Sequence, residues 1–188
     1  MSELIETLHP GLRRSLDCLV TVGSVLICAL ILPARFAGIE LLGTGPNWCL
    51  IWVVAWSLKR TPLQGGLAGL CLGFVQDGVS MAQPSHALGL ALAGVLTARL
   101  QKQRYIQEDF ISVAMIVFAM AVVVETTMAI QFSLQYLLAS VPKSYPLLTH
   151  TWLYHQQIAL SSAILSSLWA PVIYYPLNRW WRLVQATE

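Results

Sequence analysis

Four ionisable side chains stand out because they lie inside or beside long apolar segments. Glu125 sits among valines, Asp77 and His86 flank a short turn, and His155 begins the last apolar segment. A carboxylate in hydrocarbon is costly unless it is protonated, paired or facing a polar cavity, so such residues mark binding sites or ion pathways. One interpretation is that these residues form a polar mouth at the external surface, which binds a partner or a small ligand. The alternative is local: Asp77 caps a helix end, His86 sits in the interface and Glu125 bonds a neighbouring hydroxyl. We favour the local role for Asp77 and for His86, and a functional role for Glu125.

Patterns typical of catalysis are missing from the sequence. There is no Gly-x-Ser-x-Gly, no His-Glu-x-x-His and no phosphate-binding glycine loop. His150 and His155 are five residues apart, which is poor spacing for a metal pair on one helix face, and no third ligand is evident. We therefore expect no enzyme activity, no metal and no cofactor.

The composition indicates an all-α integral membrane protein. Hydrophobic residues make up 56% of the 188 residues and charged residues only 11%, whereas soluble domains carry about 25% charged residues. The net charge of +2, with no basic tract longer than two residues, argues against nucleic acid and leaves the lipid bilayer as the partner. The four cysteines lie in apolar runs without metal-ligand spacing, as small hydrophobic residues do.

Six apolar segments are bounded by proline, glycine or charged residues and are expected to span the membrane within a single domain, 1–188. Two of them are short, but burial by neighbouring helices or local bilayer thinning accommodates short spans. Merging these two would place Lys59 and Arg60 near mid-membrane at about 2.5–3.5 kcal/mol each, so two helices joined by a corner are favoured. The six predicted spans are about 16–33, 46–58, 62–76, 86–100, 109–134 and 152–177.

The basic residues predict the orientation of these spans. Cytoplasmic loops of membrane proteins are enriched in Lys and Arg. Only Arg35 and Lys143 fall on one side of the six predicted spans, and both termini then lie in the cytoplasm. The other nine basic residues fall on the opposite side: Arg13, Arg14, Lys59, Arg60, Arg99, Lys102, Arg104, Arg179 and Arg182.

Two helix faces could meet another helix. Gly65, Gly69 and Gly73 recur every four residues and let a second backbone approach closely. We favour packing of the predicted spans 62–76 and 86–100 within the chain, with docking of a partner helix as the alternative. The second predicted span carries a stripe of tryptophans on one face: Trp48, Trp52 and Trp56. For this stripe we favour contact with lipid or with other helices of the bundle over contact with a partner protein.

The middle of the chain carries a more specific pattern. A basic corner follows a tryptophan-rich span, and a glycine-rich span then ends in Gly-x-x-x-Asp before a turn with proline and a small-residue helix. The segments are WSLKR (56–60), GGLAG (65–69), GFVQDG (73–78) and PSHALGL (84–90). These segments resemble the rod shape-determining protein MreD family, although the turn has Ser85-His86 after Pro84 where the family usually has Leu-Gly.

The resemblance implies a non-catalytic subunit of the bacterial cell-elongation complex in the plasma (inner) membrane. Its implied partners are the single-span scaffold protein MreC, the actin-like MreB and a cell-wall transglycosylase/transpeptidase. The implied fold is similar to the substrate-binding S-component of energy-coupling-factor transporters. Candidate partner contacts are the tryptophan stripe, the glycine face and the Asp77–His86 turn.

Two other functions remain open. A small-molecule, vitamin-type binding subunit of a membrane transporter fits the size and span count, and it would place a pocket near Glu125, Asp77 and His155. The first span lacks the Ala-x-x-x-Ala patch that such subunits often use to dock their coupling partner, which argues mildly against this function. An intramembrane hydrolase ranks last, because it needs two polar residues converging at one depth.

Overall fold

The structure, a computed structural model, describes residues 10–32, 40–41, 43–81, 84–102, 109–138 and 145–185. This part of the chain is helical apart from a single β-bridge between Leu41 and Thr44. A helix covers each predicted span, so the all-α prediction is confirmed. The helices are α2 (Pro10–Ile31), α3 (Trp48–Ser57), α4 (Pro62–Ser80), α5 (His86–Lys102), α6 (Phe110–Leu138) and α7 (Tyr145–Gln185).

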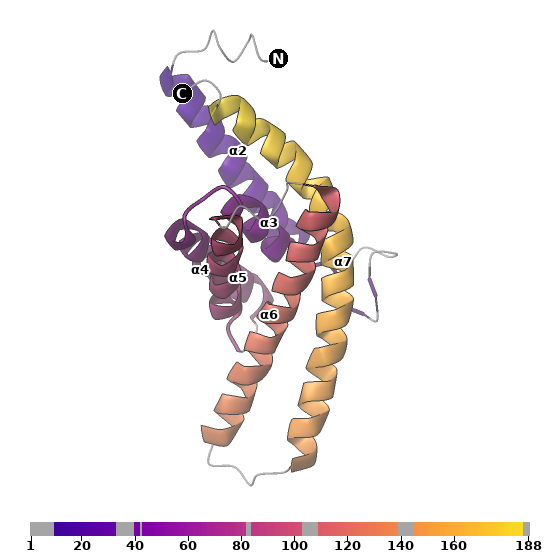
Figure 1. The fold of residues 1–188 in the computed structure, drawn as a ribbon. Helices are drawn as coiled ribbons and strands as arrows, with labels where there is room; N and C mark the ends of the chain where they lie inside the picture. The colour runs from indigo at the N-terminus through magenta and orange to yellow at the C-terminus, as the bar shows by residue number, and fades with distance from the viewer. Residues whose placement is uncertain are drawn as a thin grey trace.

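The helices form two antiparallel pairs around a short central one (Figure 1). α4 packs along α5, and α6 packs along α7, which together form the longest wall of the molecule. α5 also contacts α6, so the two pairs are joined. Helix α2 contacts α3, α4 and α7, and its start lies at the same end of the molecule as the end of α7.

Helix α3 is the core of the bundle. Every residue from Cys49 to Ala55 is at most 3% exposed, and α3 contacts all five other helices of the described chain. A helix that is apolar on all sides is stable only when it is enclosed. Its ten residues span about 15 Å, half the hydrocarbon thickness. The Asn47 side chain accepts a hydrogen bond from the Leu50 N–H, and the Asn47 N–H donates to Ser166 of α7, so the buried start of α3 has hydrogen-bond partners.

The basic corner between α3 and α4 is built as two helix ends. α3 ends at Ser57, and Pro62 opens α4 at a position where its missing N–H costs nothing. Thr61 and Gln64 form a reciprocal capping box: the Thr61 hydroxyl accepts from the Gln64 N–H, and the Gln64 side chain accepts from the Thr61 N–H. The prediction of two helices rather than one broken helix is therefore confirmed.

The glycines of α4 form the contact with α5. A methyl group added at Gly69 would overlap the Leu90 carbonyl, and one at Gly73 would overlap the Ala87 backbone. At Gly65 it would lie 2.6 Å from the Gly94 oxygen. The favoured prediction, packing of these two helices within the chain, is confirmed, and α5 covers the glycine face.

Helix α7 begins earlier than predicted. The sixth predicted span begins at about residue 152, whereas α7 already starts at Tyr145, so the predicted start of this helix is wrong. Pro146 explains the early start, because proline fits the first helical turn. Further along, α7 changes direction in its C-terminal half (Figure 1), where Pro171 and Pro176 interrupt the backbone hydrogen bonds.

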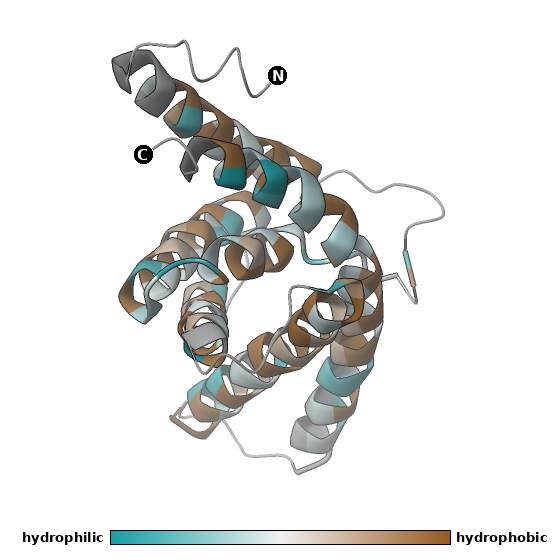
Figure 2. Ribbon diagram, turned by 45° about the horizontal axis from the view of Figure 1, so that its top comes forward, coloured by the Kyte–Doolittle hydropathy of each residue, from teal (hydrophilic) through white to brown (hydrophobic). Residues whose placement is uncertain are grey.

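By length and composition, two helical stretches of the described chain are suited to cross a membrane: Phe110–Leu138 and Trp152–Leu183. Shorter apolar stretches occur at Ser15–Ile31, Trp48–Ser57 and His86–Leu100. Hydrophobic residues recur along the helices (Figure 2), and many of the large ones are exposed as well as buried. Leu30 and Leu63, for example, are 73% and 74% exposed. An outer surface of this kind suits contact with lipid or with other membrane helices.

The α4–α5 contact yields a stability prediction. Gly69→Ala forces the two backbones apart, because the added methyl meets the Leu90 carbonyl, and such overpacking costs about 1–3 kcal/mol. Gly78→Ala is the matched control on the same helix, since nothing lies within 4 Å of its added methyl. Thermal unfolding in detergent is expected to show a lower Tm for Gly69→Ala and an unchanged or higher Tm for Gly78→Ala. Equal effects of the two substitutions would contradict this packing.

Candidate functional site

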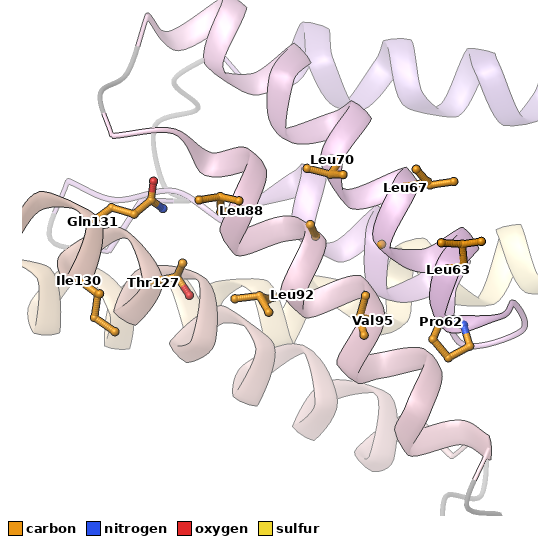
Figure 3. Close-up of a pocket in the computed structure, with 12 residues that line it drawn as sticks. Pro62, Leu63, Leu67, Leu70, Leu88, Leu92, Val95, Thr127, Ile130 and Gln131 are labelled. Carbon is orange, nitrogen blue, oxygen red and sulfur yellow. The ribbon is translucent and has the colours of Figure 1, made fainter. Parts of the chain in front are cut away.

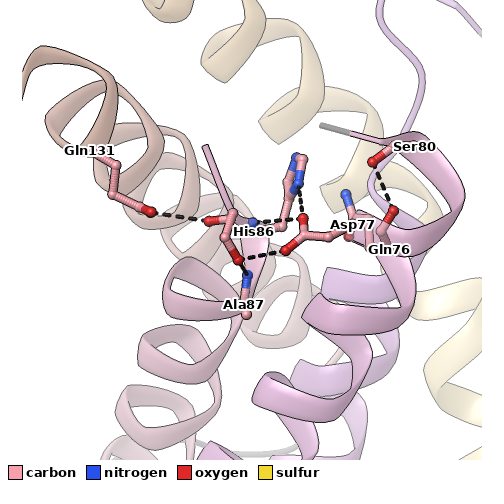
Figure 4. A network of polar contacts seen from close by, with 7 residues as sticks. Gln76, Asp77, Ser80, His86, Ala87 and Gln131 are labelled. Atoms are coloured by element: carbon pink, nitrogen blue, oxygen red, sulfur yellow. Dashed lines mark hydrogen bonds and ion pairs between the residues drawn. The ribbon is translucent and has the colours of Figure 1, made fainter. Parts of the chain in front are cut away.

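A polar cluster joins the end of α4 to the start of α5 (Figure 4). Oδ1 of Asp77 accepts a hydrogen bond from the His86 N–H at 2.8 Å, and the His86 Nδ1 lies 2.8 Å from the same oxygen. The other carboxylate oxygen accepts from the Ser85 hydroxyl. A carboxylate placed at the first turn of α5 also complements the helix dipole. Both side chains are largely buried, with 17% of Asp77 and 16% of His86 exposed.

The cluster extends to α6 through one further hydrogen bond. The Gln131 side chain donates to the Ser85 carbonyl at 3.1 Å, so three helices meet at this turn (Figure 4). α4 itself ends at Met81, which adopts the left-handed conformation and donates its N–H to the Asp77 carbonyl. The sequence indicated Asp77 and His86 as site residues but not Ser85 and Gln131. The hydrogen bond between Gln131 and Ser85 joins residues 46 positions apart, and no local sequence pattern predicts such a contact.

The other two predicted polar residues lie nearby on α6 and α7. The ring of His155 contacts Phe132, the neighbour of Gln131, with centroids 6.4 Å apart. Glu125 is partly buried on α6, nearly two turns before Gln131. The structure therefore brings Asp77 and His86 into direct contact and ties them to α6, while His155 meets α6 one residue further on. No hydrogen bond joins Glu125 to this cluster within the described residues.

The tryptophan stripe of α3 packs inside the chain. Trp48 meets Trp169 of α7 edge to face, with ring centroids 5.6 Å apart, and Trp56 meets Trp181 in the same way at 5.3 Å. Trp52 is 3% exposed and stacks on Trp56, and its Nε1 donates to the Ser24 hydroxyl of α2 at 2.8 Å. These contacts agree with the favoured interpretation, bundle packing. Beyond the stripe, the Arg60 guanidinium lies 4.4 Å from the Trp56 ring centre.

An apolar groove of about 580 Å³ runs along the outside of α4, α5 and α6 (Figure 3). Its two polar side chains are already engaged: Thr127 donates to the Val123 carbonyl and Gln131 to the Ser85 carbonyl. The groove therefore offers shape and apolar contact rather than hydrogen bonds. Its lining residues are Pro62, Leu63, Gly66, Leu67, Leu70, Leu88, Ala91, Leu92, Val95, Thr127, Ile130 and Gln131.

Comparison with known protein families gives a match to most of the chain. Residues 13–178, which are most of the chain, match the family described as rod shape-determining protein MreD. The matched range contains the basic corner, the glycine face and the Asp77–His86 turn. A comparison with curated proteins finds no match at the level required.

The Asp77 cluster predicts a pH-dependent contribution to stability. Asp77 follows the predicted span 62–76, and burial acts to raise its pKa; hydrogen bonds from Ser85 and His86 outweigh burial, so the pKa lies below the ordinary value of 3.8. A carboxyl group whose pKa is lowered in the folded protein stabilises the fold at pH values above its ordinary pKa. This stabilisation is lost as the pH falls through the lowered pKa of the folded protein. Asp77→Asn should therefore lower Tm at neutral pH, by the equivalent of about 1–3 kcal/mol.

The difference in Tm between wild type and Asp77→Asn should shrink as the pH falls below 3.8. Glu40→Gln is the control, because it removes the same charge at an exposed position outside the helices. This role of Asp77 would be ruled out if the difference in Tm did not depend on pH, or if Glu40→Gln lowered Tm by the same amount.

Proposed function

The chain belongs to the MreD family of rod shape-determining proteins, and we propose that it acts as a non-catalytic scaffold of the bacterial cell-elongation complex. In this role it links an MreC-type single-span protein and an MreB-type filament with the transglycosylase and transpeptidase that build the lateral wall. The family match over residues 13–178 carries the proposal. Family membership itself implies association with the membrane and a role in determining rod shape.

The proposed location is the inner membrane, crossed six times with both termini in the cytoplasm. The distribution of charge supports this orientation. Lys59 and Arg60 lie between α3 and α4, Arg99 lies in the last turn of α5, and Arg179 and Arg182 lie near the end of α7. In the antiparallel α4–α5 pair Gly65 faces Gly94, so Arg99 falls at the Lys59–Arg60 end. The Trp56–Trp181 contact brings the end of α7 to that end too.

The groove along α4, α5 and α6 is the surface that best suits a partner's transmembrane helix. Helices associate in membranes where small residues let them approach closely and where side chains interlock. Ala91 provides a small position in the lining, since Gly66 is buried against the Val95 side chain. The exposed side chains of Leu63, Leu67 and Leu92 line the same groove (Figure 3). The glycine face and most of the tryptophan stripe are covered by α5, α2 and α7, so this groove takes their place as the proposed partner contact.

Cross-linking from the groove tests the proposal. Leu67→Cys, in a chain also carrying Cys18→Ser and Cys71→Ser to remove the two exposed native thiols, places a reactive group in the groove. In native membranes, a thiol cross-linker is expected to join it to a single-span MreC-type protein identified by mass spectrometry. Leu168→Cys on α7 is the matched control, because Leu168 is 64% exposed but does not line the groove.

One outcome would speak against the groove, and two would speak against the scaffold role. Equal yields from the two positions would remove the groove from the partner contact. Recovery of a transporter ATPase or its coupling subunit, with no cell-wall component, would favour the alternative function as a vitamin-type binding subunit. Absence of cell-wall components from every cross-linked and co-purified product would contradict the scaffold role altogether.

A further inference from the structure

A second apolar groove, separate from the one on α4–α6, lies between α2, α3 and α7. Its volume is about 580 Å³. The Trp52–Ser24 hydrogen bond and the Trp48–Trp169 contact hold its walls together. Four tryptophans and a row of aliphatic side chains line it: Val20, Ser24, Ile27, Cys28, Ile31, Trp48, Trp52, Trp169, Val172, Ile173, Pro176, Leu177 and Trp180. The Ser24 hydroxyl already accepts a hydrogen bond from Trp52 and donates one to the Thr21 carbonyl. The body of the groove therefore suits an apolar ligand group.

Buried polar atoms without hydrogen-bond partners gather toward one end of this groove. On α7 the Nε1 of Trp180, which lines the groove, is a buried donor with no partner among the described residues. On α2, Asp17 and Thr21 precede the lining residues Val20 and Ser24 by three positions each and so share their face. The Asp17 Oδ1 and the Thr21 hydroxyl are likewise buried without a partner in the described chain. Buried polar groups are almost always paired, so this end of the groove carries hydrogen-bonding capacity that the described chain leaves unused.

Charges of both signs flank this end. Arg179 follows Val172 and Pro176 by seven and three positions, which places it on the outer face of α7 beside the groove. On the opposite side, Asp17 lies on α2 one turn before Val20, the first lining residue of that helix. The same end faces the basic corner, because Trp56, under the Arg60 guanidinium, contacts Trp181. The mouth of the groove therefore offers hydrogen-bond donors and a positive charge on α7, and a carboxylate acceptor on α2.

We propose that this groove binds a phospholipid whose headgroup carries both a phosphate and a primary ammonium, as phosphatidylethanolamine does. An acyl chain fills the tryptophan-lined groove, Trp180 and Arg179 bind the phosphate, and Asp17 accepts hydrogen bonds from the ammonium. A quaternary ammonium has no N–H to donate to Asp17, and a headgroup without an amine leaves the carboxylate facing a phosphate. The site belongs to the chain alone, so its test is independent of the partner proposed above.

Lipid retention by the purified full-length chain tests the proposal. Native mass spectrometry in detergent would compare phosphatidylethanolamine with phosphatidylcholine and phosphatidylglycerol of identical acyl chains. We expect about tenfold stronger retention of the ethanolamine lipid, the effect of one charge-assisted hydrogen bond. Asp17→Asn should abolish the preference over phosphatidylcholine. Val172→Phe, at a lining position that is 59% exposed, should reduce retention of all three lipids by filling the groove.

Matched variants separate loss of the site from loss of the fold. Leu168→Phe adds bulk at an exposed position of α7 outside the groove and should leave retention unchanged. Ile27→Phe fills the groove from α2 and should repeat the Val172→Phe result, with Tm confirming that each variant is folded. The proposal is overturned by equal retention of the ethanolamine and choline lipids, by a preference for phosphatidylglycerol, or by groove-filling variants that retain lipid like wild type.

Discussion

The structure depends on the high cost of leaving a charge or an unpaired backbone group in hydrocarbon. Each interruption between the short helices is built to avoid that cost. Thr61 and Gln64 close the start of α4, Asn47 and Ser166 close the buried start of α3, and Asp77 closes the start of α5. With these ends satisfied, α3 can be too short to cross a bilayer and still lie in the middle of the protein.

Close backbone contact converts these short helices into a rigid unit. The glycines of α4 bring it against α5 without intervening side chains, and α5 in turn contacts α6 through Gly89 and Val124. The α4–α5 pair and the longer α6–α7 pair enclose α3 and so bury its apolar surface. The outside of the described chain carries apolar grooves, among them one over α4–α6 and one between α2, α3 and α7. Such grooves are surfaces through which the helices can meet other molecules.

Much of this architecture was predictable because the signals are local. Apolar runs ended by proline, glycine or paired basic residues gave the helices, and four-residue glycine spacing gave the α4–α5 contact. Contacts between distant segments were not predictable. The spacing of Trp48, Trp52 and Trp56 left lipid and bundle contact open, and their partners Trp169, Trp181 and Ser24 lie far away in the sequence. The polar stripe of Asp17, Thr21 and Ser24 was overlooked, since one acidic residue at the edge of an apolar run has no distinctive local pattern.

The central claim is that the basic corners mark where the chain re-enters the cytoplasm, and chemical labelling tests it most directly. Gln103→Cys and Ser144→Cys, each with Cys18→Ser and Cys71→Ser, would be exposed to a membrane-impermeant maleimide in intact spheroplasts. Position 144 should label at once, whereas position 103, between Lys102 and Arg104, should label only after the membrane is permeabilised. Labelling of position 103 in intact spheroplasts would contradict the orientation and the account built on it.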